Sequence, residues 1–184
     1  MRFLLILFFW LTLNGCSDEV MVKPSSQLSL EYPVQKYSVS ELDCPFSFEK
    51  NDVATMITKN NCGININYPQ MNATVYLTYQ PVQEDNLEAL LRDAQKLAYD
   101  HTIKAESIPA FPFVNIDDNV YGMFYSINGE AASQSQFYVT DSLNHFVSGA
   151  LYFDTKPNFD SIYPAVVYLR DDIRKIMETI SWEE

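Results

Sequence analysis

Histidine, cysteine and glycine are scarce in this chain of 184 residues, which holds two, three and five of them respectively. No Cys-x-x-Cys pair or histidine cluster occurs, so the sequence predicts no metal centre. No glycine belongs to Gly-x-x-x-x-Gly-Lys or Gly-x-Gly-x-x-Gly, the loops that hold phosphates. A calcium loop with its central glycine is missing as well. We therefore expect neither a metal nor a dissociable cofactor.

Basic residues are also few, because 12 Lys and Arg stand against 24 Asp and Glu, which gives a net charge of -12. Such a charge repels phosphate groups and no basic stripe counteracts it, so we expect no nucleic-acid partner. Adjacent carboxylates such as Asp171-Asp172 are expected to be surface charge. Apolar residues make up 47% of the chain, with 12 Tyr and 12 Phe, which is ample for one hydrophobic core.

The two histidines do not form a recognisable catalytic group. His101 follows a predicted helix, where we expect its cation to meet the negative end of the helix dipole. His145 comes just after Asp141 and Ser142, and these are the residue types of a catalytic triad. Triads are assembled from separated segments, however, and no Gly-x-Ser-x-Gly elbow occurs. We therefore predict a turn at this place, no catalytic residues and no enzymatic activity.

The chain begins with a leader. Arg2 precedes the apolar run Phe3 to Leu13, whose length of about eleven residues is too short to span a bilayer. Leu13-Asn14-Gly15-Cys16 follows and resembles the lipobox of bacterial lipoproteins. This resemblance implies a signal peptide over residues 1–15 and a covalent lipid, with acyl chains such as palmitate, on Cys16. The alternative is an ordinary signal peptide and a spare thiol.

Acidic residues follow the predicted lipidation position. Ser17, Asp18 and Glu19 are similar to the surface-export signals of Bacteroidota lipoproteins. Several acyl chains on Cys16 anchor a protein stably in a membrane. We expect a lipid-anchored envelope protein, on the periplasmic face of the outer membrane rather than on the cell surface. The polar, proline-interrupted stretch 16–37 is predicted to be an extended tether.

Cys44 and Cys62 remain as an even pair once Cys16 carries lipid. In an oxidising compartment such a pair favours a disulfide, which in chain-entropy models would contribute roughly 3 kcal/mol for a loop of this length. A metal site is a less favoured alternative because histidine is so rare. A catalytic thiol is the third alternative, since Cys44 lies before Pro45 and could be exposed.

Residues 38–184 are predicted to form a single globular domain. The alternating residues 63–68 and the β-branched, aromatic segment 74–79 predict strands. Three further strands are predicted at about 119–127, 133–140 and 145–154. The Asn128-Gly129 pair is typical of a tight hairpin turn, so these three strands should form an antiparallel meander.

Two amphipathic helices are predicted from apolar residues spaced by three and four. The first is expected to be capped by Asp85 or Asn86, and the second by Asp160 or Ser161, with Pro164 in its first turn. The predicted fold class is therefore α+β, an antiparallel β-sheet packed against two amphipathic helices. A Mog1/PsbP-like sandwich is one architecture compatible with this order of elements.

Two tripeptides fit a short O-glycosylation motif used on Bacteroidota envelope proteins. They are Asp141-Ser142-Leu143 and Asp160-Ser161-Ile162, which makes Ser142 and Ser161 the candidate acceptors. Both serines are predicted at a turn or at a helix start, where modification is sterically feasible. Because so short a motif recurs by chance, unmodified serines are the alternative.

Several longer segments together resemble one family. They are Cys44-Pro45-Phe46-Ser47-Phe48, the strand from Ala73 to Tyr79, the run from Ala132 to Ser142, and the ending through Met177-Glu178-Thr179 to Trp182. In this order they look like the gliding motility lipoprotein GldD family of the Bacteroidota. The resemblance implies an envelope lipoprotein required for gliding, associated with other gliding lipoproteins and with the type IX secretion machinery. It supplies no catalytic residues.

The resemblance favours an interaction protein that stabilises or assembles part of this apparatus. The candidate contact surface is the polar segment Ser133 to Gln136 together with Phe111, which lies in the predicted irregular connection 102–118 between Pro109 and Pro112. An ordinary hydrogen-bonded strand and a cover for a sheet edge are the alternative interpretations. Another function class is a small-ligand or glycan-binding lipoprotein, because aromatic-rich sheets can stack on sugars. An enzyme is the third class, and nothing in the sequence requires it.

Overall fold

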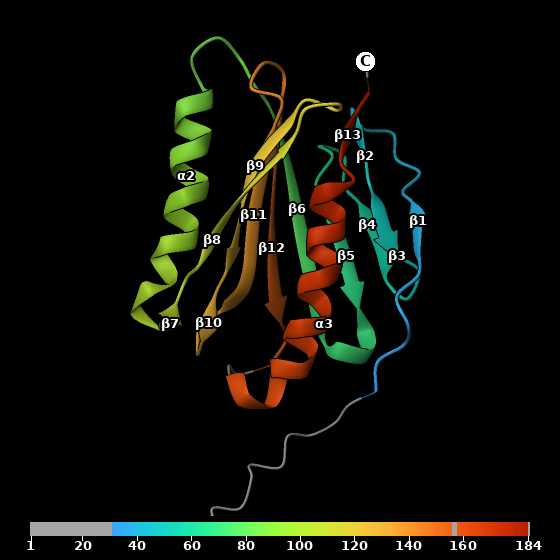
Figure 1. Cartoon of the computed structure of the whole chain (residues 1–184). Coiled ribbons are helices and arrows are strands. Elements are labelled where there is room, and N and C mark those ends of the chain that lie inside the picture. Colours follow the sequence, from blue (N-terminus) through green and yellow to red (C-terminus); the bar gives the residue numbers. More distant parts are fainter. Residues whose placement is uncertain (1–30, 156–157, 184) are drawn as a thin grey trace, which may run out of the picture.

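The computed structural model describes residues 31–155 and 158–183 (Figure 1). The predicted signal peptide 1–15, the predicted lipidation position Cys16 and most of the predicted tether 16–37 lie outside the described residues.

One antiparallel sheet of seven strands forms the centre of the fold, in the order β4-β5-β6-β12-β11-β9-β8. Its strands are β4 (Thr55–Thr58), β5 (Ile64–Tyr68), β6 (Ala73–Pro81), β8 (Ala110–Asn115), β9 (Val120–Ser126), β11 (Ser133–Thr140) and β12 (His145–Phe153). Helix α2 (Leu87–Tyr99) and helix α3 (Phe159–Glu178) pack on opposite faces of this sheet (Figure 1). The predicted α+β class, with an antiparallel sheet and two amphipathic helices, is confirmed.

The face of the sheet that contacts α3, here called the α3 face, is covered across its width. The helix contributes Val166, Leu169, Ile173 and Ile176, which are fully buried together with alternate residues of the strands. Short strands lie beside α3, and β1 pairs with β3 while β2 pairs with β13. They are β1 (Tyr37–Val39), β2 (Phe46–Ser47), β3 (Glu49–Asn51) and β13 (Ser181–Trp182).

The opposite face, here called the α2 face, is covered only in part. Helix α2 packs on Tyr125, Tyr138 and Phe146 of strands β9, β11 and β12. Towards β4 the same face is open, since Tyr76 is 39% exposed and Ile57 57% exposed. The two faces of one sheet therefore differ in how completely they are buried.

The prediction of an irregular connection over 102–118 is wrong, because most of this segment has regular secondary structure. It contains the 3-10 helix η2 (Asp100–Ile103), strand β7 (Ala105–Ser107) and the outermost strand β8. Pro112 lies inside β8, opposite Met123. An edge strand tolerates proline because it needs hydrogen bonds on one side only.

The predicted tight turn at Asn128-Gly129 is also wrong in detail. β9 and β11 do pair as an antiparallel hairpin, but Asn128–Gly129 form the short strand β10, which pairs with β7. Gly129 has φ 105, a left-handed conformation that favours glycine. The glycine is thus used for a close approach to β7 rather than for a two-residue turn.

The predicted helix caps are right in position only for Asn86, which is the N-cap residue of α2. Asn86 stands at the start of α2 but makes no side-chain cap, and its amide instead donates to the Pro81 carbonyl oxygen. Asp160 and Ser161 lie inside α3, which begins at Phe159, so that Pro164 falls beyond the first turn. The first N–H of α3, on Phe159, donates to the Glu130 carboxylate at 2.9 Å. A residue distant in sequence supplies this cap, which local patterns cannot predict.

Candidate functional site

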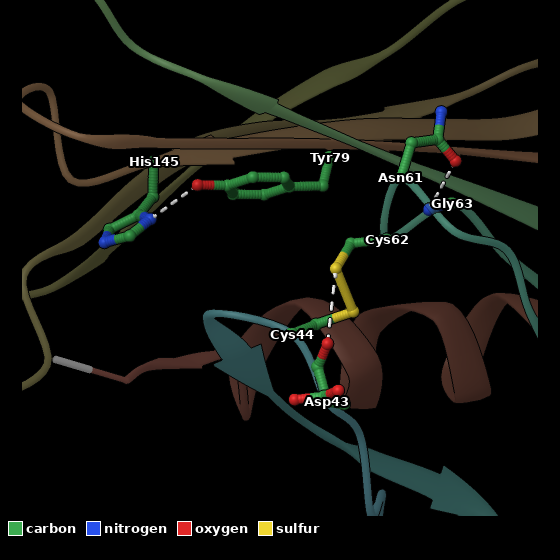
Figure 2. The surroundings of a disulfide bond; sticks show 7 residues. All are labelled: Asp43, Cys44, Asn61, Cys62, Gly63, Tyr79 and His145. Atoms are coloured by element: carbon green, nitrogen blue, oxygen red, sulfur yellow. Dashed lines mark hydrogen bonds between the residues drawn. A yellow bond between two sulfur atoms is a disulfide. The ribbon is translucent and has the colours of Figure 1, made fainter.

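The disulfide joins the two cysteines that the cysteine count predicts (Figure 2). The Cys44 and Cys62 Cα atoms are 5.7 Å apart, and the bond links the segment before β2 to the turn between β4 and β5. Cys44 belongs to the buried cluster of the α3 face. The bond therefore fastens the layer of short strands to the edge of the large sheet.

His145 makes structural contacts near the disulfide. Its Nδ1 lies 3.1 Å from the Tyr79 hydroxyl (Figure 2), and its ring stacks on Trp182 with centroids 5.1 Å apart. Burial raises the pKa of Asp141, but backbone N–H donors, including that of His145, outweigh burial and hold this pKa below its usual value. Asp141 thus caps its own turn, as predicted, and the exposed Ser142 makes no contact with the imidazole.

His101 is not the helix-end cation that we expected. It lies in η2, where its Nε2 accepts a hydrogen bond from the Gln136 amide Nε2 at 2.9 Å; an Nε2 atom that accepts carries no proton, so the ring is neutral. Burial lowers the pKa of His101, while the Asp100 charge opposes that effect only in part. A neutral ring bonded to a strand residue has replaced the predicted interaction with the helix dipole.

A buried carboxylate that the sequence did not reveal lies under α3. Asp172, expected as surface charge, is 0% exposed. It accepts hydrogen bonds from the Tyr37 hydroxyl at 2.7 Å, from Gln35 Nε2 at 2.9 Å and from Asn51 Nδ2 at 2.9 Å. Burial raises the pKa of Asp172, and these donors oppose the rise. One sequence signal was available, since Asp172 follows Leu169 by three residues and so lies on the apolar stripe.

This carboxylate fixes the start of the described chain to α3. Gln35 and Tyr37 precede or begin β1, which pairs with β3. Tyr32 packs on Tyr168 of α3, with ring centroids 5.1 Å apart. The last residues of the predicted tether 16–37 are therefore held against α3 by hydrogen bonds and aromatic contact.

The predicted contact surface is wrong for the segment Ser133 to Gln136. All four residues are buried, with at most 3% exposure, because β11 lies in the middle of the sheet. Its backbone is bonded on both sides, and Arg170 of α3 donates to the Gln134 carbonyl oxygen. Phe111 behaves as predicted, since 42% of its surface is exposed.

Phe111 belongs to an exposed patch at the edge of the α3 face. The Arg174 guanidinium lies 5.0 Å from the centre of the Phe111 ring, and Tyr163 and Val167 continue the same side of α3 towards its start. Tyr163 is 40% exposed and Val167 43% exposed. We call Phe111, Tyr163, Val167 and Arg174 the Phe111 surface.

The candidate glycosylation sites are both accessible. Ser142 lies in the exposed turn between β11 and β12, and Ser161 lies in the first turn of α3, where its hydroxyl donates to the Asn158 carbonyl oxygen at 2.9 Å. Their modification stays a prediction.

Two further findings concern the described residues alone. Within residues 31–155 and 158–183, no three His, Cys, Asp or Glu side chains gather as a metal site would require. In the same part of the chain, no helix combines the length and the apolarity needed to cross a bilayer.

Comparison with known proteins identifies one family. A family model described as gliding motility lipoprotein GldD matches residues 17–182, which include the disulfide, the large sheet and both helices. Comparison with curated proteins gives no match. Because the family model covers nearly the whole sequence, this chain belongs to the gliding motility lipoprotein GldD family.

Proposed function

We propose that this gliding motility lipoprotein is a non-catalytic accessory component that assembles or stabilises envelope machinery linked to type IX secretion. Family membership makes it a lipid-anchored envelope protein. In our proposal Cys16 carries the lipid, and the domain acts on the periplasmic face of the outer membrane. Its partners are other gliding lipoproteins and components of the secretion machinery.

The observation that carries a non-catalytic role is the use of the titratable groups in internal contacts. His145 is held between Tyr79 and Trp182, and His101 is held by Gln136. The Asp172 carboxylate is occupied by donors from the start of the chain. General acid–base chemistry needs such a group in reach of a substrate, and these are committed to the fold.

The Phe111 surface is the place that we propose for contact with a partner protein. It combines two aromatic rings, an aliphatic side chain and an arginine, a composition that is enriched at protein interfaces. Three of its four residues lie on α3, the helix to which Gln35 and Tyr37 at the end of the predicted tether are bonded. A partner that binds here would contact the same helix that the anchored segment holds.

Deletion and crosslinking test this function. A deletion strain should lose both surface spreading and type IX secretion, and the wild-type gene should restore both. A gene with Cys16→Ala should restore neither, because the protein would lack its anchor. Normal gliding and secretion in the deletion strain would contradict the proposal.

Photo-crosslinkers placed singly at Phe111 and Val167 should capture an envelope component in living cells. A crosslinker at Ile103 is the matched control, since this residue is 87% exposed but lies on η2, away from the Phe111 surface. Equal capture from a crosslinker at Ile103 would show that the Phe111 surface is not the specific contact site. Protease treatment of intact cells tests the membrane face, because cleavage without lysis would place the domain on the cell surface.

A further inference from the structure

A hollow of about 200 Å³ lies on the open part of the α2 face. One wall is the side of α2, with Leu97, and the opposite wall is Tyr76 of β6 and Tyr152 of β12. The Tyr76 and Tyr152 rings meet edge to face with centroids 5.9 Å apart. The hollow is thus framed by aromatic rings on a rigid sheet.

The register of the strands explains why a hollow forms here. Tyr76 lies opposite Ala150, Ala150 opposite Gln136, and Gln136 opposite Tyr125, so these four residues make one row across the sheet on the α2 face. Ala150 is the small member between two larger side chains. Ala94 and Leu97 of α2 line the same hollow, which the small side chain of Ala150 leaves open.

Gln136 is among the residues that line this hollow, and it carries a buried polar atom without a partner. It is only 3% exposed, its Nε2 contacts His101, and its Oε1 has no hydrogen-bond partner within the described residues. Exchanging the amide oxygen and nitrogen changes which atom is left over, but one atom still lacks a partner. A buried polar atom without a partner is costly. A hydroxyl group can donate and accept, so it satisfies the amide in either orientation.

The rest of the lining is neutral. Hydroxyl groups come from Thr78 and Ser148 in addition to the tyrosines, and among the residues that the structure describes no charged side chain lines the hollow. Burial raises the pKa of Tyr152 and of Tyr125, so these phenols stay protonated at neutral pH. A charged ligand would find no counter-ion here, whereas a neutral ligand with several hydroxyl groups would find both donors and acceptors.

We propose that this hollow binds one neutral sugar ring of a glycan. Pockets for drug-sized ligands have about 300–1,000 Å³, so this smaller hollow suits a single ring. The ring would rest against Tyr76, and a rotation of the Gln136 side chain would bring its amide, which is buried without the ligand, to one hydroxyl of the sugar. The site is independent of the accessory role, because it lies on the face opposite to the Phe111 surface.

Saturation-transfer NMR on the lipidated full-length protein tests the proposal. The detergent must have no sugar headgroup, because maltoside detergents would compete for the hollow. The probes are glucose, galactose, mannose, N-acetylglucosamine and short oligomers of each, with N-acetyltyrosine amide to represent a partner side chain. We expect at least one sugar to bind with millimolar affinity and to protect Tyr76 from iodination.

Variants locate the binding. Tyr76→Ala should weaken sugar binding about tenfold, and Gln136→Leu should abolish it. Tyr163→Ala is the matched control, because Tyr163 is 40% exposed against 39% for Tyr76 but lies on α3. Folding of each variant is checked by its thermal transition. The proposal is overturned if no sugar binds, if only N-acetyltyrosine amide binds, or if Tyr76→Ala and Tyr163→Ala have equal effects.

Discussion

The two faces of the central sheet use the same strands in different ways. On β6, Val75 and Leu77 point to the α3 face and are at most 2% exposed, whereas the alternate residues Tyr76 and Thr78 point to the α2 face and are exposed. The α3 face is closed by a helix and by a layer of short strands (Figure 1). The α2 face carries helix α2 over strands β9, β11 and β12. The α3 face therefore buries most of the core, and the α2 face leaves a hollow open.

The two faces differ in burial because the segments that flank the two helices cover different amounts of the sheet. Helix α3 is flanked by β1–β3, which bring Phe46 and Phe48 over the strands that α3 does not reach. The Phe46 ring stacks on Tyr79 with centroids 5.7 Å apart. Helix α2 has no such flank among the described residues, so Leu97 on its apolar stripe remains 47% exposed.

The largest effect is expected on the free energy of unfolding, when one leucine from each helix is replaced by alanine. Leu169→Ala, in the closed face, should lower the free energy of unfolding by about 2–5 kcal/mol because it leaves a cavity. Leu97→Ala should lower it by less than about 1 kcal/mol, since the side chain is half in solvent already. Urea denaturation of the two variants measures both values. Equal losses would show that the α2 face is as tightly packed as the α3 face.

The next effect concerns the disulfide that fastens the cover of the closed face. Replacing Cys44 and Cys62 together by serine should cost roughly 3 kcal/mol of stability, mainly by freeing the unfolded chain. Reducing agent should destabilise the wild-type protein by a similar amount and leave the double variant unchanged. Wild-type protein that is insensitive to reduction would mean that the layer of short strands holds without the bond.

A smaller effect is the pH dependence that Asp172 gives to the closed face. Because burial raises its pKa above 3.8, the folded state retains a proton that the unfolded state has lost. Stability from this group is therefore greatest at low pH and falls as pH rises from 3.8 through the raised pKa. Against Asp172→Asn, which cannot titrate, the wild-type protein should lose relative stability over this range in urea denaturation. A wild-type protein that gains stability relative to Asp172→Asn as pH rises would contradict the direction of the pKa shift.

The smallest effect has the opposite sign and belongs to the α2 face. Burial lowers the pKa of His101 below 6.5, so the unfolded state binds a proton more readily than the folded state. Stability from this group is present above pH 6.5 and is lost as pH falls through the lowered pKa. The control is His101→Gln, relative to which the wild-type protein should weaken on acidification. No change relative to this variant would show that the His101–Gln136 contact tolerates a charged imidazole.

Local sequence patterns predicted the helices and strands better than they predicted the tertiary contacts around them. The strands at 133–140 and 145–154 and both helices were found because their periodicity is strong, and the α+β class followed. The prolines of β8 concealed a strand, because proline is compatible with a sheet only at an edge and the position of the edge is a tertiary property. The cap of α3 was missed because Glu130 lies far from Phe159 in the sequence.

The candidate site shows the same division. The exposure of Phe111 could be predicted, but Ser133 to Gln136 was mistaken for a polar surface when it is a buried central strand. A polar side chain in a strand is either solvated at the surface or hydrogen-bonded in the interior. The neighbouring residues in the sequence do not distinguish these two cases. Gln136 is therefore recognisable as part of a hollow only after β12 and α2 are in place.

The sequence by itself determined the inner strands of the sheet, helices α2 and α3, the cysteine pair and the family, since these depend on residue type, spacing and motif. Tertiary structure alone decided that Asp172 is buried, that Pro112 lies on an edge, and that the α2 face stays half open. Alternation along a strand says that a sheet has two faces, but the cover over each face depends on where distant helices and strands pack. That packing is a property of contacts between residues far apart in the chain, which no local pattern specifies.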